Sequence, residues 1–76
     1  MAGFWTIVEK HGAPEVARRI EVSLRYVNQM RALERDVTPT VMDALKAGFP
    51  DEWDANAHQE ERSAQRANRS AGSEAA

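Results

Sequence analysis

The chain has 76 residues, which is enough for one small domain with a limited hydrophobic core. It contains no cysteine, and this excludes disulfides, thiol catalysis and cysteine-based zinc sites. The net charge of −2 at pH 7 gives no general attraction to nucleic acid, so DNA binding requires a locally basic face.

Apolar runs along the chain extend over only a few residues. A transmembrane helix needs about 20 consecutive apolar residues, so no membrane span is expected. The first residues lack the basic start and long apolar stretch of a signal peptide. These features predict a cytoplasmic protein.

Glycine and proline divide the first 50 residues into short segments with helical periodicity. Phe4, Ile7 and Val8 have the i, i+3, i+4 spacing of a helix face, and Gly12 follows as a stop signal. Pro14 suits the first turn of a second helix, where the N–H that proline lacks is not needed.

Two further helices are marked by capping residues. Ser23 is a favourable N-cap for a third helix over residues 24–33, and Thr38 is one for a fourth helix. Pro39 suits the first position of that fourth helix, and Gly48 suits its end.

The last third of the chain is more polar. Asp51 is expected to open a fifth segment that contains Trp53, whereas residues 63–76 have no large apolar residue and are predicted to be disordered. No segment alternates with the period of a strand. The sequence therefore predicts an all-α fold of four to five short helices over residues 1–62, followed by a disordered polar tail.

The most informative stretch is residues 13–32, APEVARRIEVSLRYVNQMRA. In a helix-turn-helix, two helices meet at a steep angle through a tight turn. The first helix needs an apolar residue directed to the core, here Val16, and a small residue where the second helix approaches, here Ala17. The other apolar and capping positions of the pattern are filled by Ile20, Val22, Ser23, Val27 and Met30.

This pattern resembles the helix-turn-helix of the Cro and repressor family of lambdoid phages and related bacterial regulators. The family pattern is apolar–Ala–x–x–apolar–Gly–apolar–Ser, then an apolar pair three residues apart; this chain reads VARRIEVS at residues 16–23 and VNQM at residues 27–30. With the flanking helices the resemblance covers residues 4–50. The chain departs from the pattern at Glu21, where the turn glycine is replaced. A left-handed backbone there costs a non-glycine residue about 1 kcal/mol.

The resemblance implies that the helix after Ser23 is a recognition helix that enters the major groove of DNA. Arginine pairs with guanine O6 and N7, asparagine or glutamine with adenine N6 and N7, and an apolar side chain with the thymine methyl. The residues expected to read bases are Leu24, Arg25, Asn28 and Gln29. Those expected to contact the DNA backbone are Arg18, Ser23, Tyr26 and Arg31.

The function implied is that of a sequence-specific, Cro-like transcriptional repressor, which occludes its operator as a homodimer. Two recognition helices would then lie about 34 Å apart in successive major grooves. Phe49 and Trp53 are the expected dimer contacts, because the aromatic residues of residues 41–53 exceed what a minimal core needs.

Other functions have fewer signals in the sequence. There is no glycine-rich phosphate loop, catalytic triad or metal motif, so neither an enzyme, a cofactor nor a small-molecule substrate is expected. His11 and His58 are far apart in the sequence and are expected on the surface rather than at a metal. Arg18 and Arg19 have an alternative role as ion-pair partners of Glu15 and Glu21. The rival function is a protein-binding adaptor or phage-encoded inhibitor on the same scaffold, which the net charge of −3 over residues 37–76 favours.

Overall fold

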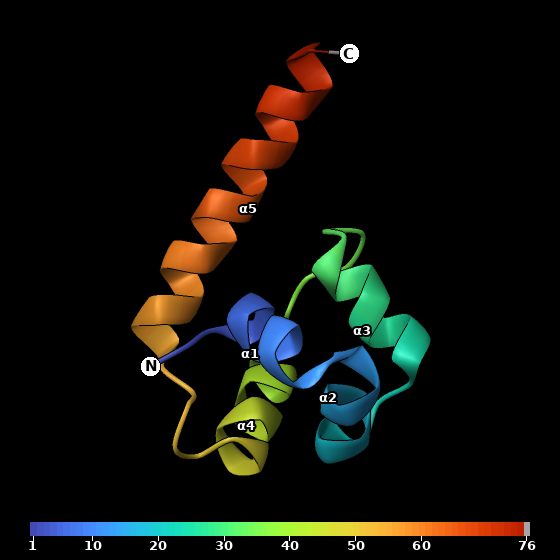
Figure 1. The fold of residues 1–76 in the computed structure, drawn as a ribbon, viewed down its shortest axis with the longest axis vertical. Coiled ribbons are helices and arrows are strands. Elements are labelled where there is room, and N and C mark those ends of the chain that lie inside the picture. Colours follow the sequence, from blue (N-terminus) through green and yellow to red (C-terminus); the bar gives the residue numbers. More distant parts are fainter. Residues whose placement is uncertain (76) are drawn as a thin grey trace.

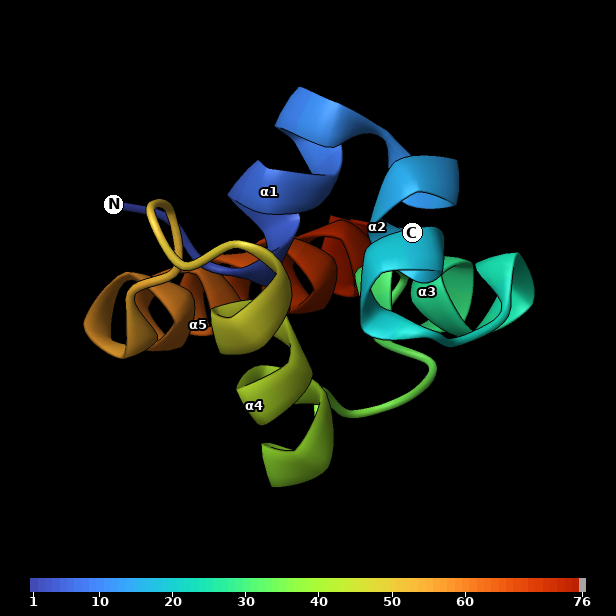
Figure 2. The ribbon, with the colours of Figure 1, turned by 90° about the horizontal axis from the view of Figure 1, so that it is seen from below.

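Five helices make up the computed structural model, which describes the backbone of residues 1–75 and the side chains of residues 1–68. They are α1 (Phe4–His11), α2 (Ala13–Ile20), α3 (Leu24–Arg31), α4 (Pro39–Gly48) and α5 (Ala55–Ala75). Helices α1–α4 form a body from which α5 projects (Figure 1). Seen from below, α1 and α5 cross on one side of this body and α2 and α3 lie on the other (Figure 2). The expected all-α fold is confirmed, and no helix in the described part of the chain is long and apolar enough to cross a membrane.

The helix boundaries follow the capping residues. Gly12 ends α1 with a φ of 88°, a conformation that glycine adopts without strain. The Ser23 Oγ accepts the N–H of Tyr26 at 3.0 Å, and the Thr38 Oγ1 accepts the N–H of Val41 at 3.3 Å. The predicted starts of α3 and α4 are therefore confirmed.

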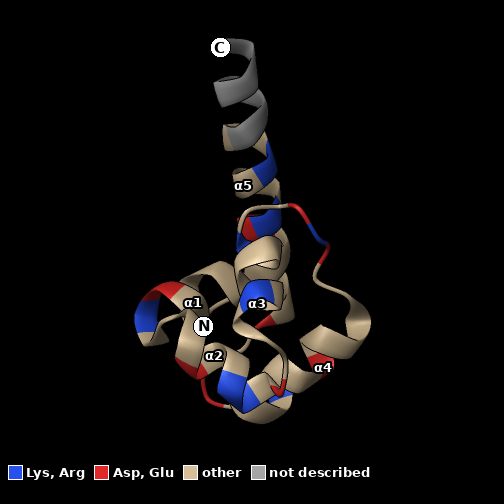
Figure 3. Cartoon of the chain, turned by 90° about the vertical axis from the view of Figure 1, so that its right-hand side faces the viewer, with Lys and Arg blue, Asp and Glu red and all other residues tan. Residues whose placement is uncertain are grey.

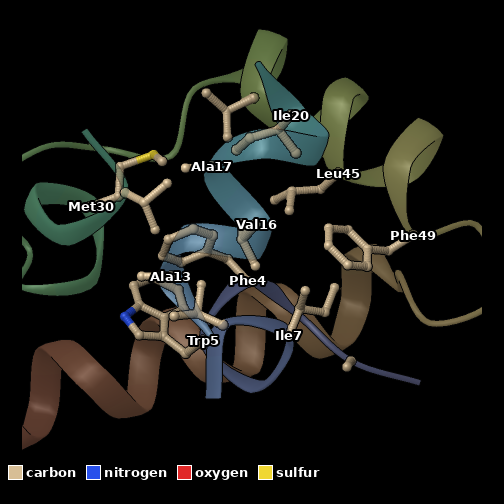
Figure 4. Close-up of a cluster of buried hydrophobic side chains, with 14 residues drawn as sticks. Phe4, Trp5, Ile7, Ala13, Val16, Ala17, Ile20, Met30, Leu45 and Phe49 are labelled. Carbon is tan, nitrogen blue, oxygen red and sulfur yellow. The ribbon is translucent and has the colours of Figure 1, made fainter. Parts of the chain in front are cut away.

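The hydrophobic core lies where α1, α2 and α4 meet. Val16 of α2 is fully buried at its centre, between Phe4 and Ile7 of α1 and Leu45 of α4 (Figure 4). This arrangement comes from the i, i+3, i+4 spacing of apolar residues on each helix. Val27 and Met30 of α3 are buried as well, which fixes α3 on the body.

The prediction that Phe49 is a dimer contact is wrong. Its side chain is 2% exposed and belongs to the core of the monomer, where it lies 4.8 Å from the Arg19 guanidinium and 5.0 Å from the ring of His11. A ring enclosed in this way has no surface left for a partner. Trp53 is half-buried, and its role as a dimer contact stays a prediction.

The last helix differs from the expectation. Asp54 rather than Asp51 begins it, because the Asp54 Oδ2 accepts the N–H of Ala57 at 3.0 Å, and Trp53 lies in the loop before it. The expected disordered tail is wrong for residues 63–68, which continue α5. The remainder of that expectation, residues 69–76, lies outside the residues whose side chains are described.

His58 is buried, not exposed as expected. Its ring is 1% exposed and stacks on Trp5 with centroids 5.5 Å apart, while Trp53 lies 5.1 Å away on a tilted plane. The Nδ1 atom accepts the backbone N–H of Phe4 at 3.3 Å. One imidazole thus joins α5 to the start of α1 and to the loop before α5.

Glu61 completes this attachment by capping α1. The first N–H groups of a helix have no partner within it, and Gly3 at the N-cap has no side chain to offer. The Glu61 carboxylate accepts the N–H of Gly3 at 2.7 Å, the N–H of Thr6 at 2.9 Å and the Thr6 hydroxyl at 2.8 Å. A residue near the end of the described chain therefore supplies the cap for its first helix.

Replacement of Gly3 by alanine is expected to weaken the docking of α5. A methyl group at Gly3 would overlap the Cα of His58 and lie 2.8 Å from its backbone nitrogen, and backbone atoms cannot yield without moving the helix. We expect Gly3→Ala to lower the free energy of unfolding by about 1–3 kcal/mol, measured by chemical denaturation. The matched control is Gly48→Ala, whose methyl group would be at an ordinary 3.5 Å from Arg19; equal losses in both variants would contradict the prediction.

The buried His58 is expected to make stability pH-dependent. Burial lowers the pKa of His58 below its ordinary value of 6.5; Glu61 opposes this with a smaller effect that raises the pKa, and Arg62 lowers it slightly further. Below pH 6.5 the unfolded chain therefore binds more protons than the folded one, and stability falls as the pH drops toward the folded-state pKa. The slope of this loss is at most about 1.4 kcal/mol per pH unit for one proton.

The measurement is denaturation of the wild-type protein and His58→Phe at pH 7.5 and 5.5. The phenylalanine keeps an aromatic ring between the two tryptophans but cannot take up a proton, so its stability should change less between the two pH values. The same change in both proteins would show that other groups cause it.

Candidate nucleic-acid interface

The turn between α2 and α3 is built around Glu21. This residue has a left-handed backbone, with φ 58° and ψ 45°. The N–H of Val22 donates to the carbonyl of Ala17 at 3.0 Å, and the N–H of Glu21 donates to that of Arg18 at 3.4 Å. These two bonds form a Schellman motif, which satisfies the last carbonyls of α2 and redirects the chain. The bend that the sequence pattern predicts is therefore present.

Helix α3 packs against α2 through small and apolar side chains. Ala17 is buried at the contact, where its single methyl group allows the two helices to approach closely. Val27 and Met30 of α3 are fully buried, and Val22 in the turn is half-buried against the core. The residues chosen from the helix-turn-helix pattern thus occupy the inner side of both helices.

The opposite face of α3 carries the side chains predicted to read bases. At 3.6 residues per turn, Arg25, Asn28 and Gln29 lie opposite the buried Val27 and Met30. Arg25 and Asn28 are exposed, and within residues 1–68 neither side chain has a hydrogen-bond or ion-pair partner. Both are therefore available to a ligand.

Leu24 and Gln29 border this pair. Leu24, the first residue of α3, is 45% exposed, which is unusual for a leucine and leaves a methyl surface at the N-terminal end of the helix. Gln29 is half-buried. The four predicted base-reading residues are therefore brought together on one helix face.

The segment around α3 is locally basic although the chain is acidic. Residues 22–33 contain Arg25 and Arg31 but no aspartate or glutamate. In the view with α3 toward the reader, acidic residues lie in the turn before it, in the loop after it and on the neighbouring helices (Figure 3). Helix α3 itself therefore carries two arginines and no carboxylate, in a segment bounded by Glu21 and Glu34.

The predicted phosphate contacts differ in their surroundings. Arg18 is exposed but bonds to Glu15, which Arg19 also contacts at 2.8 Å, as the alternative ion-pair role predicts. These hydrogen bonds, from Arg18 first and then Arg19, lower the pKa of Glu15, so the carboxylate stays ionised. Ser23 is exposed, and its capping bond uses the oxygen as acceptor, which leaves the hydroxyl proton to donate.

Tyr26 and Arg31 lie toward the sides of α3. Tyr26 is half-buried. Arg31 lines a hollow between the end of α3 and α5, together with Leu33 and Gln65. Its backbone carbonyl accepts the indole N–H of Trp5 at 3.1 Å. Arg31 therefore lies on the side of α3 that faces α5.

One residue of this region was not among the predicted site residues. Arg35, in the loop after α3, donates from Nε to the Gln29 Oε1 at 3.1 Å, and its guanidinium lies 4.6 Å from the centre of the Tyr26 ring. The loop returns to α3 because Leu33 has a left-handed backbone with φ 64°. A leucine at such a position carries no sequence signal comparable to glycine, so the contact was not predictable from the pattern.

The described residues contain no group of three or more histidine, aspartate or glutamate side chains that fits a metal ion. Comparisons with protein-family models, with characterised proteins and with solved structures find no match for this chain. The interpretation of this surface therefore depends on the chemistry and geometry of its own residues.

Replacement of Glu21 by glycine is expected to stabilise the protein. The left-handed backbone costs a non-glycine residue about 1 kcal/mol, and glycine relieves this strain while adding some entropy to the unfolded chain. We expect Glu21→Gly to raise the Tm by a few degrees, since about 1 kcal/mol corresponds to 4–8 °C in a domain of this size.

Glu21→Ala is the matched control, because it removes the carboxylate but keeps the strain. It should have a lower Tm than the glycine variant. A glycine variant no more stable than the alanine variant would argue against strain at this turn.

Proposed function

We propose that this protein is a sequence-specific DNA-binding transcriptional regulator of the helix-turn-helix type. The observation that carries the proposal is the outer face of α3. There Arg25 and Asn28 are exposed and have no hydrogen-bond or ion-pair partner among residues 1–68, and Gln29 lies beside them. Arginine and amide side chains match the donor and acceptor pattern of purine edges in the major groove. If this face of α3 were only a solvated surface, there would be no need for an arginine and two amides side by side, or for the strained turn that orients them.

Local charge supports the same function. A helix N-terminus and nearby arginines attract phosphate, and the start of α3 carries Ser23 and Arg25 with no acidic residue between Val22 and Leu33. Arg18 is available to a phosphate once its bond to Glu15 is exchanged. Phosphate contacts of this kind position a protein on DNA, whereas contacts to bases give the specificity.

The regulator is proposed to act in the cytoplasm as a homodimer that occludes its operator. A two-fold axis would place two α3 helices about 34 Å apart, one helical turn of DNA. Trp53 remains the proposed dimer contact; it lines a surface hollow with Met42 and Lys46 beside α4. A dimer of this kind favours a near-palindromic site.

The test is selection of duplexes from a random pool by the wild-type protein and by Arg25→Ala. We expect the wild type to enrich two related half-sites whose centres are about 10 base pairs apart, with binding that weakens steeply as salt increases. Arg25→Ala should reduce the preference at one base pair of each half-site by about tenfold, within the range expected for one bidentate contact.

Lys10→Ala is the matched control, because it also removes one positive charge but lies on α1, where Lys10 pairs with Glu52. It should keep the preference of the wild type at every position. Absence of duplex binding at low salt would overturn the proposal and favour the protein-binding alternative. Enrichment of unrelated sequences would show that the protein binds DNA without reading it.

A further inference from the structure

The C-terminal end of α3 holds the loop after it in a defined position. The N–H of Leu33 donates to the carbonyl of Met30 at 3.2 Å, and the N–H of Glu34 donates to that of Gln29 at 2.9 Å. This is a second Schellman motif, again with a non-glycine residue in the left-handed position. The next residue, Arg35, is thereby placed beside the side chain of Gln29.

Two contacts keep Arg35 there. Its guanidinium lies 4.6 Å from the centre of the half-buried Tyr26 ring, within the range of a cation–π interaction, and its Nε donates to the Gln29 Oε1. The neighbouring Asp36 is bonded to Arg66 of α5 at 3.3 Å, which draws that carboxylate away from Arg35. The Arg35 guanidinium therefore bonds to Gln29 rather than to Asp36.

The chemistry of arginine decides which way the glutamine amide points. A guanidinium has only N–H donors and no acceptor, so the Gln29 atom that faces it must be the carbonyl oxygen. The NH2 group of the same amide then carries the two donors that remain for another ligand. In this arrangement Gln29 presents donors, whereas adenine recognition by glutamine needs the oxygen and the nitrogen together.

We infer that Arg35 is a specificity-determining residue that makes Gln29 read DNA as a hydrogen-bond donor and so favours guanine over adenine at its base pair. Guanine presents two acceptors, N7 and O6, in the major groove, whereas adenine presents one acceptor and one donor. The inference rests on the proposed function, since it concerns how the outer face of α3 reads bases. Arg35 acts through Gln29 and needs no base contact of its own.

The test first identifies the base pair whose preference is lost in Gln29→Ala. Relative affinities for duplexes with guanine or adenine at that position are then measured for the wild type, for Arg35→Ala and for the charge control Lys10→Ala, whose side chain pairs with Glu52 away from α3. We expect the wild type and the control to prefer guanine by about fivefold or more. Arg35→Ala should shift the ratio toward adenine by about five- to tenfold, because the freed amide can make both bonds to adenine.

Three outcomes would overturn the inference. A wild type that prefers adenine at this position would show that the oxygen of Gln29 is free, and an Arg35→Ala variant that binds all duplexes equally weaker would make Arg35 a phosphate contact. In both cases DNA binding, and with it the proposed function, would stand. A wild type that binds no duplex would instead remove the proposed function as well. A readout on the free protein tests the contact itself: the side-chain amide NMR signals of Gln29 should shift in Arg35→Ala and stay in place in Lys10→Ala.

Discussion

The left-handed backbone at Glu21 is the constraint on which the arrangement of the α2–α3 surface depends. It ends α2, satisfies that helix's last carbonyls and sets the direction in which α3 leaves. Only with this bend can Val27 and Met30 enter the core while Arg25 and Asn28 remain outside. A glutamate adopts this conformation at a cost in backbone strain energy. The free energy gained when α3 packs on α2 therefore has to exceed that cost. The α2–α3 unit is therefore held by tertiary contacts rather than by the preference of its turn residue.

Helix α5 has a different part in the structure. It contributes little apolar surface to the core. It attaches to the body through two specific groups: the His58 imidazole, which contacts two indole rings, and the Glu61 carboxylate, which caps α1. Bonds of this kind depend on geometry, because a buried acceptor or donor that loses its partner is more costly than a weakened apolar contact. The attachment of α5 thus rests on a few specific polar contacts, whereas α1–α4 rest on a continuous core.

Helix positions and the face of α3 were predictable because they depend on local signals. Helix starts are marked by the capping residues Ser23 and Thr38 and by Pro14 and Pro39, and the spacing of apolar residues marks the buried side of each helix. His58, Glu61 and Arg35 were not predictable in the same way. His58 and Glu61 have their roles because α5 returns to the distant start of α1, and Arg35 has its role because the chain turns at Leu33. Neither event has a signature in a single sequence. The error at Phe49 has the same origin, since an aromatic residue in the sequence does not show whether its ring is buried within the monomer or exposed to a partner.

The cap of α1 has a consequence for the order in which the protein can mature. Chains are synthesised from the N-terminus, and a domain completes its folding only when its distant contacts are available. Here the acceptor for the N–H groups of Gly3 and Thr6 is a carboxylate 58 residues further along from Gly3. Helix α1 thus leaves the ribosome well before the residue that caps it. A chain that stops before Glu61 would keep these N–H groups exposed, without the acceptor that the folded protein gives them.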